Sequence, residues 1–125
     1  MTKTAIVVLS DPKATSDESL GRLFNALFIV HDLKEKGRDV VLIFQGAGVR
    51  WAAEISKPDH PAHHLYQAIR DTRIEVCGGC ADVFGETDAA SDTGLPLVRD
   101  RMIAGTTGVI DLSTYCEDGN RLIVF

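Results

Sequence analysis

The chain contains two short apolar runs, Thr4-Ala-Ile-Val-Val-Leu9 and Val40-Val-Leu-Ile-Phe44. Both are rich in β-branched residues and lack the alternation of polar and apolar positions that a strand shows when one of its faces meets water. Continuous apolar runs of this length are typical of strands that are covered on both faces, as they are in parallel sheets. The two runs therefore predict an α/β fold.

The region between the two runs has the pattern of a long helix, from about Asp17 to Lys36. Ser16 or Asp17 can cap its first turn, and Gly37 follows its lysine-containing last turn. The apolar residues of this region recur at helical spacing and form one stripe for burial, made of Leu20, Leu23, Phe24, Leu27 and Val30. A strand, a helix and a strand in this order predict a parallel βαβ unit.

The middle of the chain continues the alternation of helices and strands. We expect a short helix over Val49–Ser56 and a helix from Pro61 to about Asp71, since proline suits the first position of a helix. A strand over Arg73–Val76 and a helix from about Gly79 to Phe84 should follow, and then a polar stretch up to Pro96.

The last part of the chain must supply two more strands and a connection between them. We expect a strand at about Arg101–Ala104, a turn over Gly105–Gly108, a helix through Leu112, Tyr115 and Cys116, and a final strand over Arg121–Phe125. Parallel neighbouring strands need such a crossover, which is usually helical. The whole sequence thus predicts one domain, residues 1–125, built on an open, mostly parallel five-stranded sheet with helices on both faces.

Composition narrows the functional classes. The 125 residues are 45% hydrophobic and 25% charged, as in a soluble globular protein. A net charge of -5 without a cluster of Lys or Arg argues against a nucleic-acid partner. The apolar runs are far shorter than the roughly 20 residues of a membrane helix, so no membrane association is expected. Three cysteines without a secretory signal predict a reducing, cytoplasmic location.

Glycine-rich turns and two thiols gather where the predicted strands end. Ligands of open α/β sheets bind at this edge. Cys77 ends a strand and begins a helix, so main-chain amides should hold its thiolate at the mouth of a crevice. We predict Cys77 as a nucleophile and Cys80, one helical turn further on, as its resolving partner. The predicted ligand-binding residues around them are Gln45, Gly46, Gly48, Gly78, Gly79 and Trp51.

A zinc site is an alternative use of the same cysteines. Cys77 and Cys80 would provide two ligands, and Cys116 with one of the histidines could complete the four that a structural site needs; the nearest histidines are His60, His63 and His64. Histidines at the start of a helix more often act as caps or remain solvated. We therefore predict neither a metal nor a cofactor.

One segment resembles a known family. The stretch Cys77-Gly-Gly-Cys-Ala-Asp-Val-Phe-Gly85, which follows a strand, is similar to the DsrE/DsrF-like family, which includes YchN-like proteins and TusD-type sulfur-relay subunits. The turn in Ile43–Val49 and the terminal strand in Asp118–Phe125 resemble the same family. This resemblance implies a small α/β subunit that forms homotrimers or homohexamers. It also implies that Cys77 accepts sulfur as a persulfide from a donor protein and passes it to an acceptor protein.

Two residues depart from the family pattern. Cys80 stands where sulfur-relay members usually have a small residue, and a second thiol can discharge a persulfide as a disulfide. Phe84 stands where many members have a basic residue. The leading hypothesis is a cytoplasmic sulfur-transfer or thiol-relay protein that uses Cys77. Its alternatives are a non-catalytic oligomeric module that binds a small molecule or anion, and a dithiol oxidoreductase that uses Cys77 and Cys80.

Overall fold

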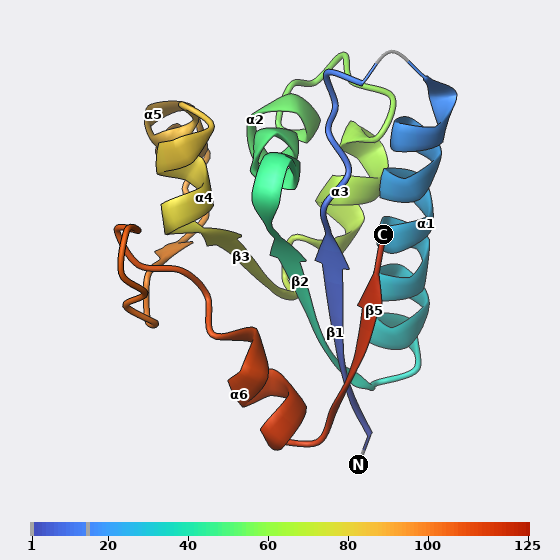
Figure 1. Ribbon diagram of the computed structural model, residues 1–125. Helices are drawn as coiled ribbons and strands as arrows, with labels where there is room; N and C mark the ends of the chain where they lie inside the picture. Colours follow the sequence, from blue (N-terminus) through green and yellow to red (C-terminus); the bar gives the residue numbers. More distant parts are fainter. Residues whose placement is uncertain (1, 15) are drawn as a thin grey trace.

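A computed structural model describes residues 2–14 and 16–125 (Figure 1). Within these residues, five strands form one parallel sheet in the order β4-β3-β2-β1-β5. The fold class predicted from the sequence is confirmed. The strands are β1 (Lys3–Val8), β2 (Asp39–Phe44), β3 (Arg73–Cys77), β4 (Leu97–Val98) and β5 (Asn120–Val124).

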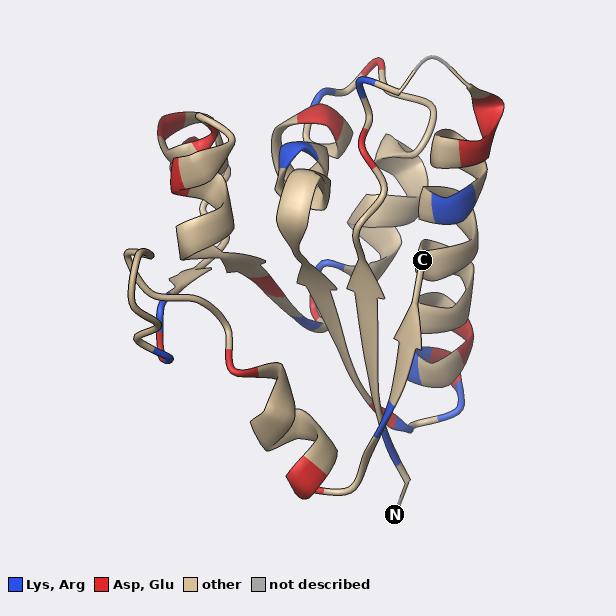
Figure 2. Ribbon diagram, viewed as in Figure 1, with Lys and Arg blue, Asp and Glu red and all other residues tan. Residues whose placement is uncertain are grey.

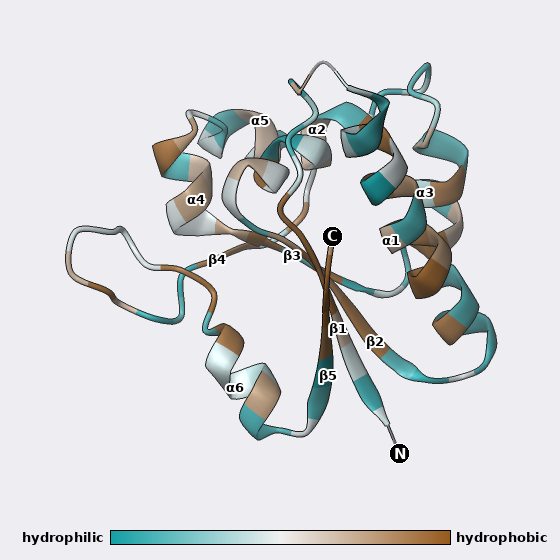
Figure 3. Ribbon diagram, turned by 45° about the vertical axis from the view of Figure 1, so that its right-hand side comes forward, coloured by the Kyte–Doolittle hydropathy of each residue, from teal (hydrophilic) through white to brown (hydrophobic). Residues whose placement is uncertain are grey.

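Helices connect the strands and cover the sheet. In Figures 1 and 3, α1 and α3 lie on one face of the sheet and α6 lies on the other. The helices are α1 (Asp17–Glu35), α2 (Trp51–Ile55), α3 (His63–Ile69), α4 (Gly78–Val83), α5 (Thr87–Asp92) and α6 (Leu112–Glu117), with a 3-10 turn η1 (Gly46–Arg50) before α2. The helix α1 is the longest, and no helix in the described residues is both long and apolar enough to span a bilayer.

The two apolar runs form the centre of the sheet. The strands β1 and β2 pair in parallel from Lys3 with Asp39 to Val8 with Phe44, and all but the first residue of each is buried. In Figure 2 the charged residues of these strands lie only at their starts. A charge inside the sheet occurs at Glu75 of β3, where Arg73 and the hydroxyl of Tyr115 from α6 bind its carboxylate. Complete burial explains why these runs lack polar alternation.

The predicted stripe of α1 faces the core. Leu23, Leu27 and Val30 are fully buried, and Leu20 and Phe24 pack partly against the core cluster. Ser16 occupies the N-cap position, although its side chain makes no capping hydrogen bond.

The predicted strand at Arg101–Ala104 is wrong. The fourth strand is β4, which pairs with Val76 and Cys77 of β3, while Arg101 forms only an isolated antiparallel bridge with Val109. Pro96 concealed this strand, because proline interrupts a strand pattern except at a sheet edge. The carbonyl oxygen of Pro96 accepts a hydrogen bond from the N–H of Val76. Because β4 is an edge strand, the N–H that proline lacks has no neighbouring strand to bond on the outer side.

The polar stretch before Pro96 contains a helix that the sequence analysis did not predict. This helix, α5, has the sequence Thr87-Asp-Ala-Ala-Ser-Asp92, and Ala90 is its only buried residue. Without an apolar stripe, the segment gives no helical periodicity to detect.

Gly48 provides a test of how closely η1 packs on the sheet. A Cβ atom at Gly48 would overlap the carbonyl oxygen of Val8, at the end of β1. We predict that Gly48→Ala lowers the free energy of unfolding by about 2 kcal/mol, since backbone atoms cannot yield as a side chain can. Chemical denaturation measures this loss.

Gly21→Ala is the matched control. Gly21 lies within α1, and a Cβ atom there would meet nothing within 4 Å beyond the backbone of its own helix. Alanine favours a helix over glycine, so this variant should gain up to about 1 kcal/mol. Equal stabilities of the two variants would contradict the packing described at Gly48.

Candidate functional site

Cys77 lies at the junction of β3 and α4, as predicted. It is the last residue of β3 and the N-cap of α4. Its sulfur accepts a hydrogen bond from the backbone N–H of Cys80 at 3.5 Å. The side chain therefore takes the position of a capping group, and unpaired amides of the first helical turn point toward it.

A set of hydrogen-bond donors stabilises the thiolate of Cys77. The thiol of Cys80 is the strongest influence, and the backbone amides of Ile110, Cys80 and Gly79 add to it. Burial opposes these donors, because removing a thiolate from water is unfavourable. Together they lower the pKa of Cys77 to about 6, so that its thiolate predominates at neutral pH.

Cys80 has the opposite environment. Its thiol donates to the sulfur of Cys77, and this hydrogen bond together with burial raises the pKa of Cys80 well above its ordinary value. The backbone amide of Gly46 favours the ionised form but does not overcome the two other effects. These opposite shifts make Cys77 the more acidic thiol of the pair and Cys80 the thiol that keeps its proton longer.

The predicted accessibility of Cys77 is wrong for the single chain. Its exposed fraction is 0%, whereas Cys80 is half-buried. We call residues 99–110 the covering segment, because they lie against the start of α4. A Cβ atom at Gly79 would lie 2.6 Å from the carbonyl oxygen of Gly108. The sulfur of Cys77 is therefore enclosed by the chain and surrounded by backbone N–H groups. It does not lie at the mouth of an open crevice.

The glycines predicted to bind a ligand allow the chain to pack closely on itself. Gly78 lies against the side chain of Arg99, Gly79 against Gly108, and Gly48 against β1. Gly46 has a positive φ of 57° and directs its amide to the thiol of Cys80. Four glycine positions therefore shape the surroundings of the two thiols or of the neighbouring turn.

Two other predicted residues lie at the same end of the sheet. Gln45 precedes η1, and its side-chain oxygen is buried without a hydrogen-bond partner among the described residues. Trp51 is only 2% exposed, and its indole N–H donates to the carbonyl of Ser10 at 2.8 Å. Trp51 lines a pocket of about 300 Å³ with Glu54 and His60, and neither cysteine contributes to this pocket.

Arg50 is a residue that the sequence analysis missed. Its guanidinium lies 5.1 Å from the centre of the Phe84 ring and forms an ion pair with Asp11 at 2.8 Å. Arg50 thus brings a positive charge onto the Phe84 ring from another element. Asp11, which follows β1, holds that guanidinium. The sequence gives no sign of this contact, because 34 positions separate Arg50 from Phe84.

The histidines and Cys116 lie apart from the thiol pair. His60 accepts the N–H of Ala62 at 3.0 Å, and a ring nitrogen of His63 lies 2.8 Å from the carbonyl oxygen of Ile55. Among the described residues, no side chain caps the first turn of α3, so the capping role expected of these histidines is not found there. Cys116 is exposed on α6. No group of three or more potential metal ligands occurs in residues 2–14 and 16–125.

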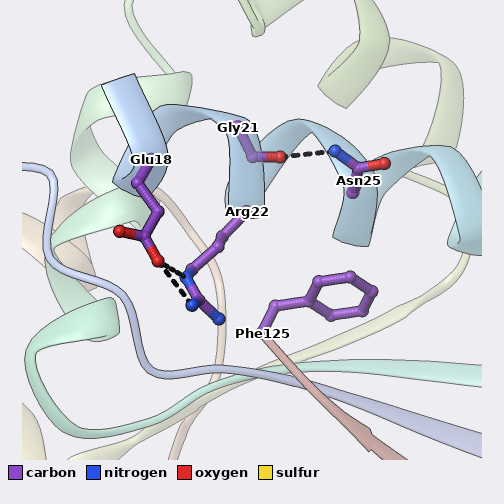
Figure 4. A pocket seen from close by; sticks show the side chains of 5 residues that line it. All are labelled: Glu18, Gly21, Arg22, Asn25 and Phe125. Carbon is purple, nitrogen blue, oxygen red and sulfur yellow. Dashed lines mark hydrogen bonds and ion pairs between the residues drawn. The ribbon is translucent and has the colours of Figure 1, made fainter. Parts of the chain in front are cut away.

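A further cavity, of about 420 Å³, lies between α1 and the end of β5 (Figure 4). Its polar side chains bind one another or the helix: Arg22 pairs with Glu18 at 2.6 Å, and the amide of Asn25 donates to the carbonyl of Gly21. This cavity is at the β5 side of the sheet, whereas the thiols follow β3. It offers no nucleophile to a ligand.

Two neighbouring thiols at a strand–helix junction of a parallel sheet, one buried and one half-buried, define a dithiol site. The chain belongs to the DsrE/DsrF-like family, which it matches over residues 2–125. It is 29% identical over 101 residues to the uncharacterized protein MJ0733 of Methanocaldococcus jannaschii, an alignment covering 81% of this chain and 78% of the relative.

Two solved structures share the fold. The YchN protein of Escherichia coli superposes with a TM-score of 0.68 and 20% identity, over 100% of both chains. The protein BT1422 of Bacteroides thetaiotaomicron, of unknown function, superposes with a TM-score of 0.63 and 18% identity, over 97% of this chain and 94% of its own. The resemblance drawn from the Cys77 segment is confirmed at the level of family and fold.

The opposite pKa shifts of the two cysteines lead to a pH prediction. Thiolate absorbance in the ultraviolet should rise through a midpoint near pH 6 as Cys77 ionises, because its pKa lies below that of an ordinary thiol. Cys77→Ala should remove this step. Cys80→Ala should move it to higher pH, since it removes the strongest donor. A step that persists in Cys77→Ala would contradict the assignment.

Proposed function

We propose that the protein is a cytoplasmic sulfur-transfer protein in which Cys77 carries sulfur as a persulfide. The observation that supports this proposal most is the convergence of three backbone amides and one thiol on the sulfur of Cys77. The thiolate is the nucleophilic form of cysteine, and these donors stabilise it at neutral pH. A reducing compartment would keep the two thiols of the pair free for this chemistry.

The transfer step is a displacement at sulfur. The thiolate of Cys77 attacks the terminal sulfur of a donor persulfide, so that a new S–S bond forms at Cys77 and the S–S bond of the donor breaks. The donor leaves as a thiolate, and the transferred sulfur becomes the terminal sulfur of a Cys77 persulfide. An acceptor thiolate then repeats the displacement and regenerates the thiolate of Cys77. No external oxidant or reductant takes part.

Cys80 has a defined part in this proposal. In the resting state its thiol donates to the Cys77 thiolate, and its raised pKa keeps it protonated. A protonated thiol is a poor nucleophile. If Cys80 loses its proton, it can attack the inner sulfur of the persulfide, form a disulfide with Cys77 and release hydrosulfide.

The contact between the thiols also supports a second candidate function, that of a dithiol oxidoreductase. Cys77 would attack a substrate disulfide and release one thiolate, and Cys80 would then resolve the mixed disulfide and release the other. The two cysteines give two electrons to the substrate and end as a disulfide, which a dithiol reductant must reduce before the next turnover. The effect of Cys80→Ala separates the candidates, because an oxidoreductase would lose turnover whereas a sulfur carrier would not need Cys80 for loading.

Mass spectrometry tests sulfur loading. After incubation with a cysteine desulfurase and cysteine, or with thiosulfate, the Cys77 peptide should gain the mass of one sulfur atom. Cys77→Ala should reduce loading of the chain by at least about tenfold, in keeping with the loss of an essential nucleophile. Cys116→Ala, which removes an exposed thiol outside the pair, is the matched control and should load normally.

Cys80→Ala completes this test. The persulfide on Cys77 should last longer in this variant, because the neighbouring thiol that could discharge it is gone. Sulfur found mainly on Cys116, or loading that Cys77→Ala leaves unchanged, would contradict the proposed sulfur transfer.

The proposal includes assembly into a homotrimer or homohexamer, as the family resemblance implies. The edge strand β5 supports it with two apolar side chains on one face, Leu122 at 38% and Val124 at 51% exposure. Their register partners Ala5 and Val7 are buried, and Figure 3 shows that β5 is largely hydrophobic after its start. The outer side of β5 has no strand partner in the described chain, and such edges favour association.

Light scattering tests this assembly. We predict that the chain is a trimer or hexamer at micromolar concentration, and that Leu122→Glu with Val124→Glu shifts it toward the monomer, since charges resist burial in an interface. Ala89→Glu, on the exposed side of α5, is the matched control for added charge. A monomeric native chain would contradict this part of the proposal.

A further inference from the structure

The carboxylate of Asp82 fastens the covering segment to α4. Arg99 donates to both carboxylate oxygens at 3.2 Å, and the hydroxyl of Thr107 donates to one of them. The hydroxyl of Thr87, at the start of α5, donates to the other oxygen. These hydrogen bonds lower the pKa of Asp82 to about 2, so it is ionised at neutral pH. One carboxylate in α4 thus holds both arms of the covering segment.

The covering segment is exposed at its tip and buried at its second end, where Gly108 and Ile110 lie against the protein. Its two arms join each other through the paired backbone bonds of Arg101 and Val109, both 2.9 Å long. Its tip faces water: Met102 is 73% exposed and Ile103 is 46% exposed. Opening therefore has to move the exposed tip outward and withdraw Ile110 from the core cluster, while the sheet beneath stays folded.

The position of the covering segment decides two properties of Cys77. Its residue Ile110 contributes a backbone amide to the thiolate. The segment also lies over the start of α4, where Cys77 has no exposed surface. In this position the segment donates an amide to the sulfur of Cys77 and packs against the helical turn that Cys77 begins. Sulfur exchange between proteins requires direct attack on the sulfur atom. Cys77 has no exposed surface, so a partner protein cannot reach its sulfur in this arrangement.

We propose that Asp82 is a positioning residue that holds the covering segment closed over Cys77, and that this segment opens when Cys77 exchanges sulfur. The reason for opening, sulfur exchange at Cys77, rests on the proposed function. The opening itself is a change in the accessibility of one sulfur atom. That accessibility can be measured without any sulfur donor. The geometry assigns Asp82 no contact with the reacting atoms, so its effect on Cys77 passes through Arg99, Thr107 and Ile110.

Alkylation by iodoacetamide, followed by peptide mapping at low conversion, tests the inference in the full chain. The thiolate displaces iodide and forms a carbon–sulfur bond, which marks Cys77 permanently. At a pH well above the pKa of Cys77, Asp82→Asn should alkylate Cys77 about tenfold faster, since loss of one charge-assisted hydrogen bond shifts an opening equilibrium by about that factor. The half-maximal pH of this reaction should also rise, because the Ile110 amide departs with the segment.

Matched variants separate opening from general loosening. Asp92→Asn removes an exposed carboxylate from α5 and should leave the Cys77 rate at the native value. Thr107→Val removes one hydrogen bond to Asp82 and keeps the ion pair with Arg99, so its rate should fall between native and Asp82→Asn. This variant also tests the inference if Asp82→Asn does not fold. Alkylation of the exposed Cys116 serves as the internal reference in every variant.

The outcomes distinguish this inference from the proposed function. Faster alkylation and a higher half-maximal pH in Asp82→Asn support the positioning role, even if Cys77 never accepts sulfur. Native rates and native pH dependence in both Asp82→Asn and Thr107→Val would overturn it, even if Cys77 accepts sulfur readily. A rate in Asp92→Asn that equals the rate in Asp82→Asn would also overturn it.

Discussion

The hydrogen bonds that converge on the sulfur of Cys77 connect the fold to its chemistry. The thiol of Cys80 and the amides of Gly79, Cys80 and Ile110 all favour the ionised sulfur, against the cost of burial. Three of these donors come from the first turn of α4, and one comes from a segment that is distant in the sequence. An enclosed thiolate therefore needs both the local turn and the return of the chain across the sheet.

The strand order explains how the chain returns. The first three strands are laid side by side, β4 extends the sheet, and β5 lies at the far side of β1. The connection from β4 to β5 must therefore cross the sheet, and it carries the covering segment and α6. Glycines at positions 79 and 108 let this connection approach α4 closely. The connection from β4 to β5 thus places α6 on the face of the sheet opposite α1 and α3 (Figure 1), and it brings the covering segment to Cys77.

The sequence predicted those features that depend on local pattern. Apolar runs located β1 and β2, and the spacing of Cys77 and Cys80 placed both thiols in one helical turn. The missed features join residues far apart in the chain: Arg50 with Phe84, and Asp82 with Thr107. Sequence periodicity reports only on residues that are close along the chain, so it cannot predict such contacts. The short strand β4 was missed for another reason, because two residues beside a proline carry too little pattern.

Carbon-13 NMR of the cysteine Cβ atoms tests the central claim most directly, because their chemical shifts report the ionisation of each sulfur separately. In the native chain at neutral pH, the account predicts a thiolate resonance for Cys77 and a thiol resonance for Cys80 at the same time. A Cys77 resonance that stays in the thiol position until pH rises well above 8, as in an ordinary cysteine, would contradict it.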